Sequence, residues 1–420
     1  MSMIITNIKS LVGIREKSNL LRGTELAELP SLEDAFLKIE GDEIAGYGKM
    51  QDLNISDLAI KNIDASGTMV LPAWCDSHTH LVFGGSREGE FVDKLKGFSY
   101  SEINEKGGGI LNSARKLNEI AADELYRLAL TRLEEVSQLG TGAIEIKSGY
   151  GLSPEGELKM LRVIDRLKKN SRITIKSTFL AHTYPLVYRD NHKAYIDLII
   201  NEMLPVIAKE KLADYIDVFC EKGFFSVEEM EMICRAGLSY GLRPKLHVNQ
   251  LHSLGGVQSG LKLNAVSLDH LENLSDEEIA LLGRSNSPSS SAKAWKGVAT
   301  LLPTAAFFLR MPFQPARRLI EGGAAIAIAT DYNPGSSPSG NMNFVISLSC
   351  IQMRMLPEEA INAATLNGAY AMGIEEELGS ITIGKKANLI FTRPIPSLAY
   401  LPYTFGNNQI DKVMIKGAFI

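Results

Sequence analysis

Short apolar runs alternate with longer amphipathic stretches through most of the chain, from about residue 71 to about residue 370. This alternation is typical of βα units, in which each buried strand is followed by a helix that covers a parallel sheet. Eight apolar runs qualify as strands, at residues 68–74, 143–146, 173–181, 215–220, 244–248, 265–269, 298–302 and 325–330. Eight such units predict an α/β protein with a (β/α)8 TIM-like barrel.

Local signals between these runs support helices. Ser226 with Glu229, and Ser275 with Glu278, each place a hydroxyl before a helix and a carboxylate three residues later, which is the pattern of a capping box. Gly140 follows an apolar stripe at the position where a helix C-terminus favours positive φ. The intervening stretches are therefore predicted to be helical.

The two ends of the chain differ from its middle. Residues 1–70 and 371–420 consist of short strand-like runs that glycine, asparagine and aspartate interrupt. A barrel inserted between such segments returns the chain near its starting point. We therefore expect three segments: 1–70 and 371–420 as the two parts of a small β-sandwich domain, and 71–370 as the barrel.

Composition excludes several partners. The 420 residues carry a formal net charge of -5, so no basic surface for nucleic acid is expected. No run approaches the ~18 apolar residues of a membrane helix, and residues 1–21 lack the features of a signal peptide. Four cysteines without C-x-x-C spacing are expected to be reduced thiols in a cytoplasmic protein. The serine-rich residues 285–297 are expected to form an exposed loop.

Polar residues lie at or just beyond the ends of the apolar runs. The carboxyl ends of barrel strands share one face, which is where such barrels hold their active sites. Residues distant in the sequence are therefore expected to converge there: His78, His80, Lys147, His182, Glu221, His247, His270 and Asp331.

Three imidazoles and a carboxylate form a candidate metal site. Side chains two apart on a strand point the same way, so His78 and His80 can reach one ion; His247 and Asp331 come from the fifth and eighth strands. Such a set suits zinc or iron with one position left for water. Hydroxide formed from that water is the expected nucleophile, Asp331 the base and acid, and His270 the group that orients it. Alternatively, Asp331 caps a turn and His270 caps a helix.

These residues, in this order, resemble the amidohydrolase superfamily across nearly the whole chain. Longer segments are similar to one branch of it: DSHTHLVFGGSREGEF, EKGGGILNSARK, IEIKSGYGL, FLAHTYP, LHVNQ, AIATDYNPGSS and LGSITIGKKANLIF. The resemblance implies ring-opening hydrolysis of 4-imidazolone-5-propanoate to N-formimidoyl-L-glutamate in histidine degradation. Residues 215–223 offer no convincing lysine for carbamylation, so one metal ion per subunit is expected. Asn388 stands where relatives carry aspartate, and Ala73-Trp74 follows Pro72 where they carry glycine.

The resemblance also implies a substrate pocket. Arg87 offers a cation for the propionate, although a surface salt bridge to Glu88 or Glu90 is the alternative. Gln250 matches a position that carries either glutamate or glutamine in the family. Because a glutamine side chain is not basic, Gln250 cannot act as a general base. The other substrate contacts that the resemblance implies are Tyr100, Tyr150, His182, Asn333, Gly335 and Ser336.

Two other functions stay open. A non-catalytic barrel could serve as a binding protein, and an enzyme of the same architecture could act on another cyclic amide or amidine, or deaminate an aminopurine. The metal ligands argue against the first, and Arg87 argues against a deaminase of neutral bases. The expected partner is a small molecule. Homodimers are common in the family, but no residue here indicates one.

Overall fold

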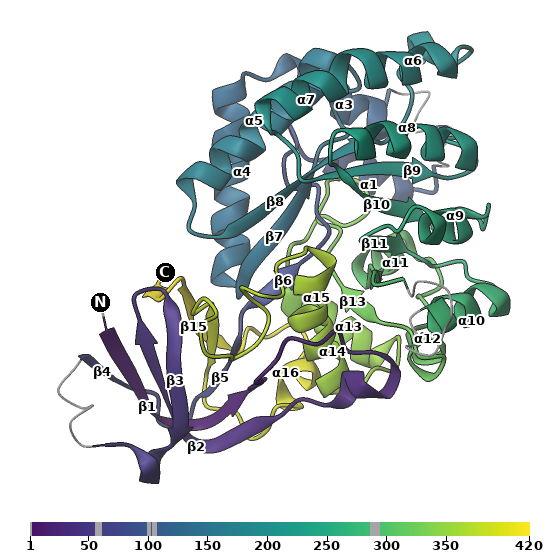
Figure 1. Ribbon diagram of the computed structural model, residues 1–420. Helices are drawn as coiled ribbons and strands as arrows, with labels where there is room; N and C mark the ends of the chain where they lie inside the picture. Colours follow the sequence, from purple (N-terminus) through teal and green to yellow (C-terminus); the bar gives the residue numbers. More distant parts are fainter. Residues whose placement is uncertain (1, 55–60, 99–101, 103–106, 286–294) are drawn as a thin grey trace.

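The structure is a computed structural model that describes residues 2–54, 61–98, 102, 107–285 and 295–420. It contains a barrel of parallel strands surrounded by helices and a separate sheet built from both ends of the chain (Figure 1). Tyr100 and most of the predicted serine-rich loop lie outside the described residues. Among the helices described, none is both long and apolar enough to cross a membrane.

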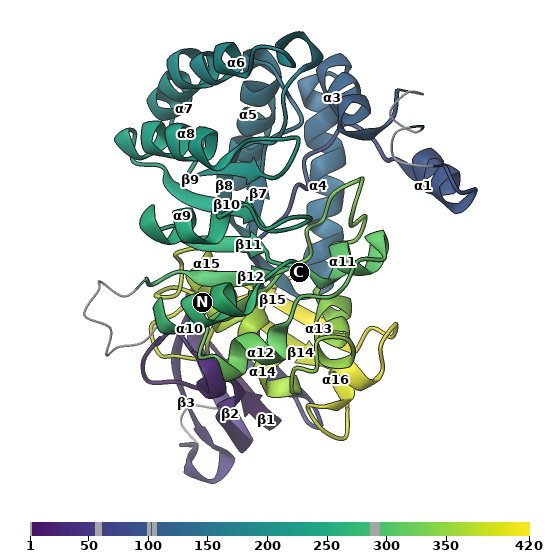
Figure 2. The same ribbon diagram turned by 90° about the vertical axis from the view of Figure 1, so that its right-hand side faces the viewer.

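The eight barrel strands pair in chain order, and each neighbouring pair is parallel. Figure 2 shows strands β7 to β12 stacked at the centre of the molecule, with helices on their outer side. The strands are β6 (Trp74–Asp76), β7 (Thr141–Lys147), β8 (Thr174–Ala181), β9 (Tyr215–Cys220), β10 (Arg243–Val248), β11 (Ser267–His270), β12 (Val298–Leu301) and β13 (Ile326–Ile328). The predicted (β/α)8 fold is confirmed.

The first predicted strand needs correction. Residues 68–74 do not form one strand, because Met69–Pro72 is strand β5 of the other sheet and Trp74–Asp76 is β6 of the barrel. Between them, the Ala73 amide donates to the Asn388 carbonyl oxygen at 2.9 Å and the Trp74 amide to that of Gly140 at 2.9 Å. Consecutive residues thus bond to different sheets, and His78 and His80 follow β6 instead of lying on it.

The helices begin where the sequence predicted. In both capping boxes the serine hydroxyl accepts from the glutamate amide and the glutamate carboxylate accepts from the serine amide. Gly140 has φ 102°, as expected after a helix. The helices are α1 (Glu88–Leu95), α3 (Gly109–Glu119), α4 (Ala122–Gln138), α5 (Pro154–Asn170), α6 (His192–Leu198), α7 (Leu204–Glu210), α8 (Val227–Ser239), α9 (Gly256–Lys262), α10 (Asp276–Ser285), α11 (Pro303–Leu309), α12 (Ala316–Glu321), α13 (Met342–Ile351), α14 (Pro357–Ala364), α15 (Leu366–Ala371) and α16 (Tyr400–Tyr403).

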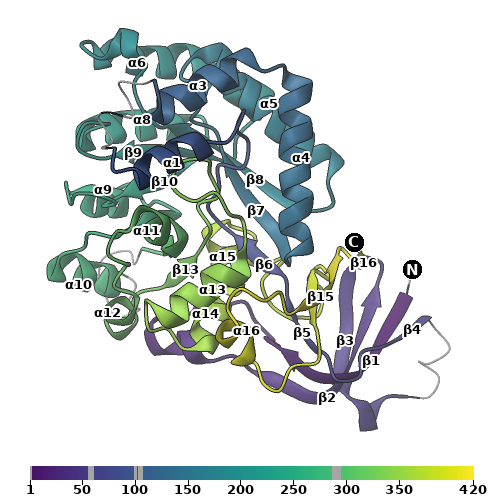
Figure 3. The same ribbon diagram turned by 180° about the vertical axis from the view of Figure 1, so that it is seen from behind.

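Strands from both termini share the second sheet, which lies to one side of the barrel (Figure 3). Its order is β16-β15-β14-β5-β1-β2-β3, with β4 beside β1, and β14 joins the two termini by pairing antiparallel to β5. The strands are β1 (Ser2–Val12), β2 (Ser31–Glu40), β3 (Glu43–Lys49), β4 (Lys61–Asp64), β5, β14 (Leu389–Thr392), β15 (Ile410–Ile415) and β16 (Ala418–Phe419). The domain boundaries at residues 70 and 370 stay predictions.

Backbone bonds close the barrel beyond the ends of its first and last strands. The Asp331 amide donates to the His78 carbonyl oxygen at 3.0 Å, and the His80 amide donates to that of Tyr332 at 2.9 Å. Asp76 supports this seam, because its carboxylate accepts from the Thr330 amide at 3.1 Å and from the Thr330 hydroxyl at 2.7 Å. The residues that close the barrel are therefore the predicted metal ligands or their neighbours.

Buried amides tie the terminal segments to the barrel. The Asn388 side chain donates to the Gly142 carbonyl oxygen in β7 at 3.0 Å, a bond that an aspartate carboxylate at this position could not make. Asn367, fully buried in α15, donates to the carbonyl oxygens of Leu21 at 2.9 Å and Ile326 at 2.8 Å, and accepts from the Leu21 amide at 3.1 Å. Both N–H donors of this side-chain amide and one of the two acceptor positions of its oxygen are therefore used.

Asn367→Asp is expected to lower the free energy of unfolding by at least about 3 kcal/mol, because a carboxylate would face two buried carbonyl oxygens that lose their donor. Denaturant titration measures the change. The matched control is Asn408→Asp, since the exposed Asn408 only accepts from the Ile410 amide and aspartate preserves that bond. Equal stability of the Asn367 variant and the parent would contradict this account.

Candidate metal centre and active site

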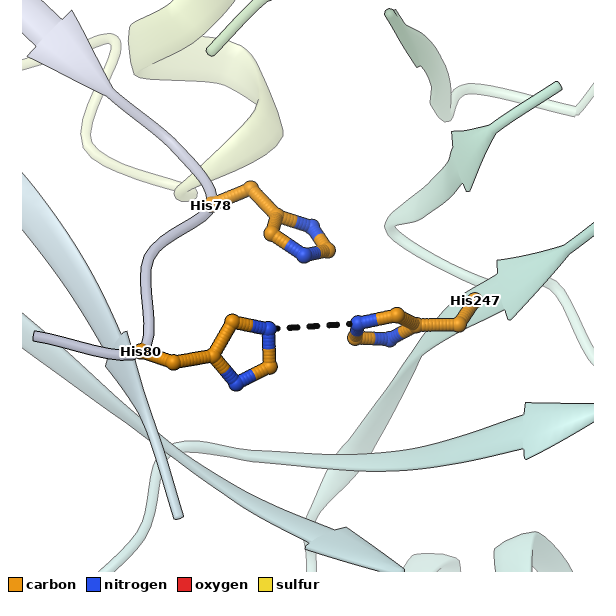
Figure 4. A group of neighbouring side chains, drawn as sticks. All are labelled: His78, His80 and His247. Atoms are coloured by element: carbon orange, nitrogen blue, oxygen red, sulfur yellow. Dashed lines mark hydrogen bonds between the residues drawn. The ribbon is translucent and has the colours of Figure 1, made fainter. Parts of the chain in front are cut away.

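The imidazoles of His78, His80 and His247 converge at the barrel seam (Figure 4), and the carboxylate of Asp331 lies beside two of them. The Asp331 Oδ1 atom lies 3.6 Å from His78 Nε2 and 3.5 Å from His80 Nε2, and the His80 and His247 Nε2 atoms are 3.4 Å apart. A tetrahedral ion with ligands at about 2.0–2.2 Å separates neighbouring ligand atoms by about 3.3–3.6 Å. These three separations therefore fit ligands of one divalent metal ion. The three histidines form one group of mutually close donor atoms, and Asp331 forms a second such group with His78 and His270.

Buried carboxylates orient two of the imidazoles. Asp269 Oδ2 lies 2.6 Å from His78 Nδ1, and Asp217 Oδ2 lies 2.7 Å from His247 Nδ1. A carboxylate at Nδ1 holds the proton there, so that Nε2 presents its lone pair to the cluster. The fully buried His78 Nε2 atom has no hydrogen-bond partner among the described residues. A metal ion would supply this partner.

The protonation states also fit a cation. Burial, together with Lys147 for His78 and with neighbouring histidines for His80 and His247, lowers the pKa of all three imidazoles well below the usual value. Neutral imidazole is the form that binds metals. Burial raises the pKa of Asp331 to about 6 although His270 opposes the shift. The raised pKa indicates that the described residues do not fully compensate the negative charge of the Asp331 carboxylate.

His270 lies beside the cluster in a different state. Burial disfavours its imidazolium, but the carboxylates of Glu272, Asp331 and Asp269 outweigh this and raise the pKa of His270. Its Nδ1 atom lies 3.3 Å from Glu272 Oε1, which also accepts from Gln314 at 2.9 Å. The alternative of a helix cap is wrong, because Ser275 caps α10.

Positive backbone φ angles occur at both residues assigned to proton transfer. Asp331 has φ 53° and His270 has φ 83°, and the next residue, Leu271, has φ 65°. Residues other than glycine adopt this region at a cost, which the surrounding structure must offset, and such residues cluster at functional sites. The strain supports a functional role for the turns after β11 and β13.

A cavity of about 440 Å³ opens over the cluster and brings most predicted site residues together. Apolar side chains from several elements complete its walls, including Ile110, Phe219 and Leu309. Lys147 and Glu221 do not line it. The predicted residues that line the cavity are His80, Arg87, Tyr150, His182, His247, Gln250, His270, Asp331, Asn333, Gly335 and Ser336.

Arg87 lines the cavity and also forms the ion pair that was its alternative interpretation. Its Nε and Nη2 atoms donate to Glu90 Oε2 at 2.8 and 2.6 Å, and both side chains are largely buried. A Cβ atom on Gly335 would lie 2.3 Å from Arg87 Nη1, so only glycine permits this approach. Two of the three guanidinium nitrogens are therefore engaged by Glu90, and Nη1 faces Gly335.

Tyr150 and His182 form an aromatic wall with His80. The His182 ring lies 5.7 Å from the His80 ring and 5.6 Å from the Tyr150 ring, measured between centroids. Burial lowers the pKa of His182 to about 4 and raises the pKa of Tyr150. Both groups are therefore neutral near pH 7 and can offer hydrogen bonds to a substrate.

The loop after β13 is organised around Asn333. Its Oδ1 atom accepts from the amides of Gly335 and Ser336, both at 2.8 Å, and its Nδ2 atom donates to the Asp331 carbonyl oxygen at 2.6 Å. The Ser336 hydroxyl donates to Asp331 Oδ2 at 3.1 Å. Asp331 thus contacts the turn through one oxygen, as its capping alternative supposed, and faces the histidines with the other.

Sequence reasoning assigned no role to a buried charge network below the cluster. Lys147 Nζ lies 2.8 Å from Glu145 and 2.9 Å from Asp217, and 3.6 Å from Asp269, while Lys245 Nζ lies 3.0 Å from Glu145. All five side chains are fully buried. The available signal was charged residues inside apolar strands, at alternating positions that face the barrel interior.

The network fixes the charge of Lys147. Burial alone would lower the pKa of Lys147, but Asp217, Glu145 and Asp269 outweigh it and raise that pKa. Two of these carboxylates are the ones that orient the histidines. The ammonium therefore offsets the negative charge that the two histidine partners require.

Comparisons with known proteins agree with this geometry. A parallel barrel with a cluster of histidine and aspartate residues at its strand ends is typical of an amidohydrolase. The sequence model of the family described as Amidohydrolase family matches residues 69–420 of this chain. The chain belongs to this family, and within it to the imidazolonepropionases. Membership implies a divalent metal, which the cluster fits.

The chain is 56% identical to the imidazolonepropionase of Flavobacterium johnsoniae over the full length of both proteins. It is 51% identical to that of Christiangramia forsetii, also over both full lengths, and 42% identical to that of Clostridium tetani over 95% of this chain and 93% of the relative.

Solved structures share the fold at low identity. A guanine deaminase of E. coli matches with a TM-score of 0.72 at 15% identity, over 100% of this chain and 99% of the other. An adenosine deaminase of Xanthomonas campestris, solved with bound zinc, matches with a TM-score of 0.71 at 16% identity, over 99% and 92%. These likenesses confirm the architecture.

Lys147→Met is expected to lower the free energy of unfolding by about 3–5 kcal/mol, because it leaves buried carboxylates without their cation. Lys168→Met is the control: Lys168 forms an exposed ion pair with Asp214 at 3.2 Å, and such pairs contribute about 1 kcal/mol or less. Denaturant titration of both variants in the presence of a chelator measures the difference. Similar stability of the two variants would exclude the proposed role of the network.

Proposed function

We propose that the protein hydrolyses 4-imidazolone-5-propanoate to N-formimidoyl-L-glutamate, as expected for an imidazolonepropionase. The observation that carries the proposal is one cavity with a metal-binding cluster on its floor and the Arg87 cation on its wall. A ring that bears a propionate matches both features. The full-length identity to imidazolonepropionases supports the same substrate.

His78, His80, His247 and Asp331 are the residues that would hold the metal ion, and zinc or iron suits this donor set. When bound, such an ion supplies a Lewis acid that polarises a carbonyl group and lowers the pKa of water. The absence of a suitable lysine in residues 215–223 favours a single ion in each subunit.

Asp331 and His270 share the proton chemistry. Water adds to the ring carbonyl carbon, and the bond from this carbon to the ring nitrogen breaks. Asp331, with its pKa raised to about 6, accepts a proton from the water and delivers a proton to the departing nitrogen. His270 faces the same volume and can donate a hydrogen bond to the oxygen on which negative charge develops.

The remaining wall residues bind the substrate. Arg87 contacts the propionate, Tyr150 and His182 offer neutral hydrogen-bonding groups, and the loop of Asn333, Gly335 and Ser336 closes the side next to Asp331. Gln250 lines the cavity but has no basic group, which leaves the proton to Asp331 and His270. The assignment of Tyr100 to substrate binding stays a prediction.

The two other functions are less well supported. A binding protein without catalysis has no need of two overlapping groups of metal-binding side chains, two backbone positions with positive φ and a raised carboxyl pKa. A deaminase of neutral bases has no need of cations on the cavity wall. We further propose that the protein works in the cytoplasm on a small molecule alone, without nucleic acid or membrane, as a homodimer.

The purified protein is expected to contain about one zinc or iron ion per subunit and to consume freshly prepared 4-imidazolone-5-propanoate, as measured by ultraviolet absorbance. A chelator should abolish turnover and added metal should restore it, because the cluster supplies the Lewis acid. His247→Ala should lose both the metal and the activity. Turnover that survives complete metal removal would overturn the mechanism, and no turnover by the metal-loaded protein would overturn the substrate.

Arg87→Leu is expected to raise KM for the imidazolone about 10- to 100-fold with a smaller change in kcat, because a charge-assisted contact to the propionate is lost. The variant also leaves the Glu90 carboxylate without its partner, which would repel the substrate. The double variant Arg87→Leu/Glu90→Gln separates these effects. An unchanged KM in both variants would exclude the carboxylate-binding role.

A further inference from the structure

Helix α1 directs a short stripe of charge at the cavity. Arg87, Glu90 and Lys94 are spaced by three and four residues, so that they share one face of the helix. Arg87 and Lys94 line the cavity over the metal cluster, and all three residues line an adjoining cavity of about 390 Å³. Figure 2 shows α1 at the edge of the molecule, outside the other helices.

The first cation of this stripe is neutralised within the protein. Glu90 Oε2 accepts from two nitrogens of Arg87, at 2.8 and 2.6 Å, and Glu90 Oε1 accepts from Asn112 Nδ2 at 3.0 Å. The guanidinium and the carboxylate together carry no net charge. Arg87 can therefore offer one directed donor, Nη1, but little long-range attraction for an anion.

The second cation has no such partner. Lys94 is half-buried, and its ammonium forms no hydrogen bond or ion pair with any residue that the structure describes. Burial, reinforced by Arg87 and opposed by Glu90, lowers the pKa of Lys94. A cation in this position is favoured by an anion, and the part of the chain that the structure describes provides none within bonding distance of its ammonium.

The walls near these cations are apolar and exclude competing charge. Ile110, Leu309 and Met311 line the cavity that Lys94 enters, and a low local dielectric strengthens the attraction between opposite charges. Among the described residues, the carboxylates that line this cavity or the adjoining one have partners within the protein: Asp331 bonds to Ser336, Glu88 to Ser86, and Glu90 to Arg87.

We propose that Lys94 binds the carboxylate of the substrate together with Arg87 Nη1, and that Lys94 supplies the net positive charge by which the cavity selects an anionic over a neutral ring. The inference rests on the proposed function and names its specificity-determining residue. Arg87 then sets the direction of the carboxylate, and Lys94 provides its counter-charge.

The kinetic test compares Lys94→Met with the matched control Lys96→Met, whose exposed side chain lies on the same helix end and does not line the cavity. Lys94→Met should raise KM for 4-imidazolone-5-propanoate about 10-fold or more with kcat within about 2-fold, whereas Lys96→Met should leave both unchanged. The amide of the same substrate, which is neutral, should show equal KM with the parent and with Lys94→Met. Lys94→Arg should retain the preference for the acid.

A binding test separates this inference from the proposed reaction. The probes are 3-(imidazol-4-yl)propanoate and its amide, which cannot be hydrolysed at the ring, and their affinities for the metal-loaded protein are measured by calorimetry. The parent should bind the acid about 10-fold more tightly than the amide, and Lys94→Met should lose this difference. If the parent protein prefers the acid probe as expected but turns over no imidazolone, only the proposed function is overturned. If Lys94→Met keeps the full preference, the role of Lys94 is overturned.

Discussion

The site depends on how the barrel closes. Strand β6 has only three residues and strand β13 also has three, so the seam is completed by the backbone beyond them, through the bonds from Asp331 to His78 and from His80 to Tyr332. Three of these residues, His78, His80 and Asp331, carry side chains that we propose to bind the metal. Because these backbone bonds lie at the cluster itself, a change that opens the seam would also separate the proposed ligands. The closure of the barrel and the geometry of the site therefore depend on the same contacts.

A second constraint is the charge below the cluster. Carboxylates at Nδ1 make His78 and His247 present Nε2 to the cluster, and these carboxylates are buried and need cations in turn. Asp217 and Asp269 meet the first need, and Lys147 meets the second for both of them. The barrel interior therefore holds a layered arrangement in which negative and positive charges alternate away from the metal site. Removing one layer leaves buried charge in the next without compensation.

The alternating pattern predicted the eight strands. The position of polar residues at strand ends predicted Lys147 and Glu221, which do not line the cavity, and five side chains that do line it: His80, His182, His247, His270 and Asp331. Both signals depend on local periodicity, which the sequence displays directly. Three features could not be predicted from local periodicity. The division of residues 68–74 between two sheets depends on partners 66 and 315 residues away, as the bonds from Trp74 to Gly140 and from Ala73 to Asn388 show. The positive φ of Asp331 and His270 results from tertiary packing. The pairing of Arg87 with Glu90 was one of two alternatives that spacing alone could not separate.

The two ends of the cavity differ in how tightly their residues are packed. The proposed metal ligands are fully or almost fully buried at strand ends, whereas α1, which follows Arg87 and carries Lys94, contains no fully buried residue. Its contacts include Arg87 with Glu90, Glu90 with Asn112, and the ring of Phe91 on that of Phe308 at 5.4 Å. An anion bound between Arg87 and Lys94 would add contacts to the least packed wall of the site. Binding energy from the propionate, remote from the reacting carbonyl group, can thus serve to hold this wall in place while the strand ends perform the reaction.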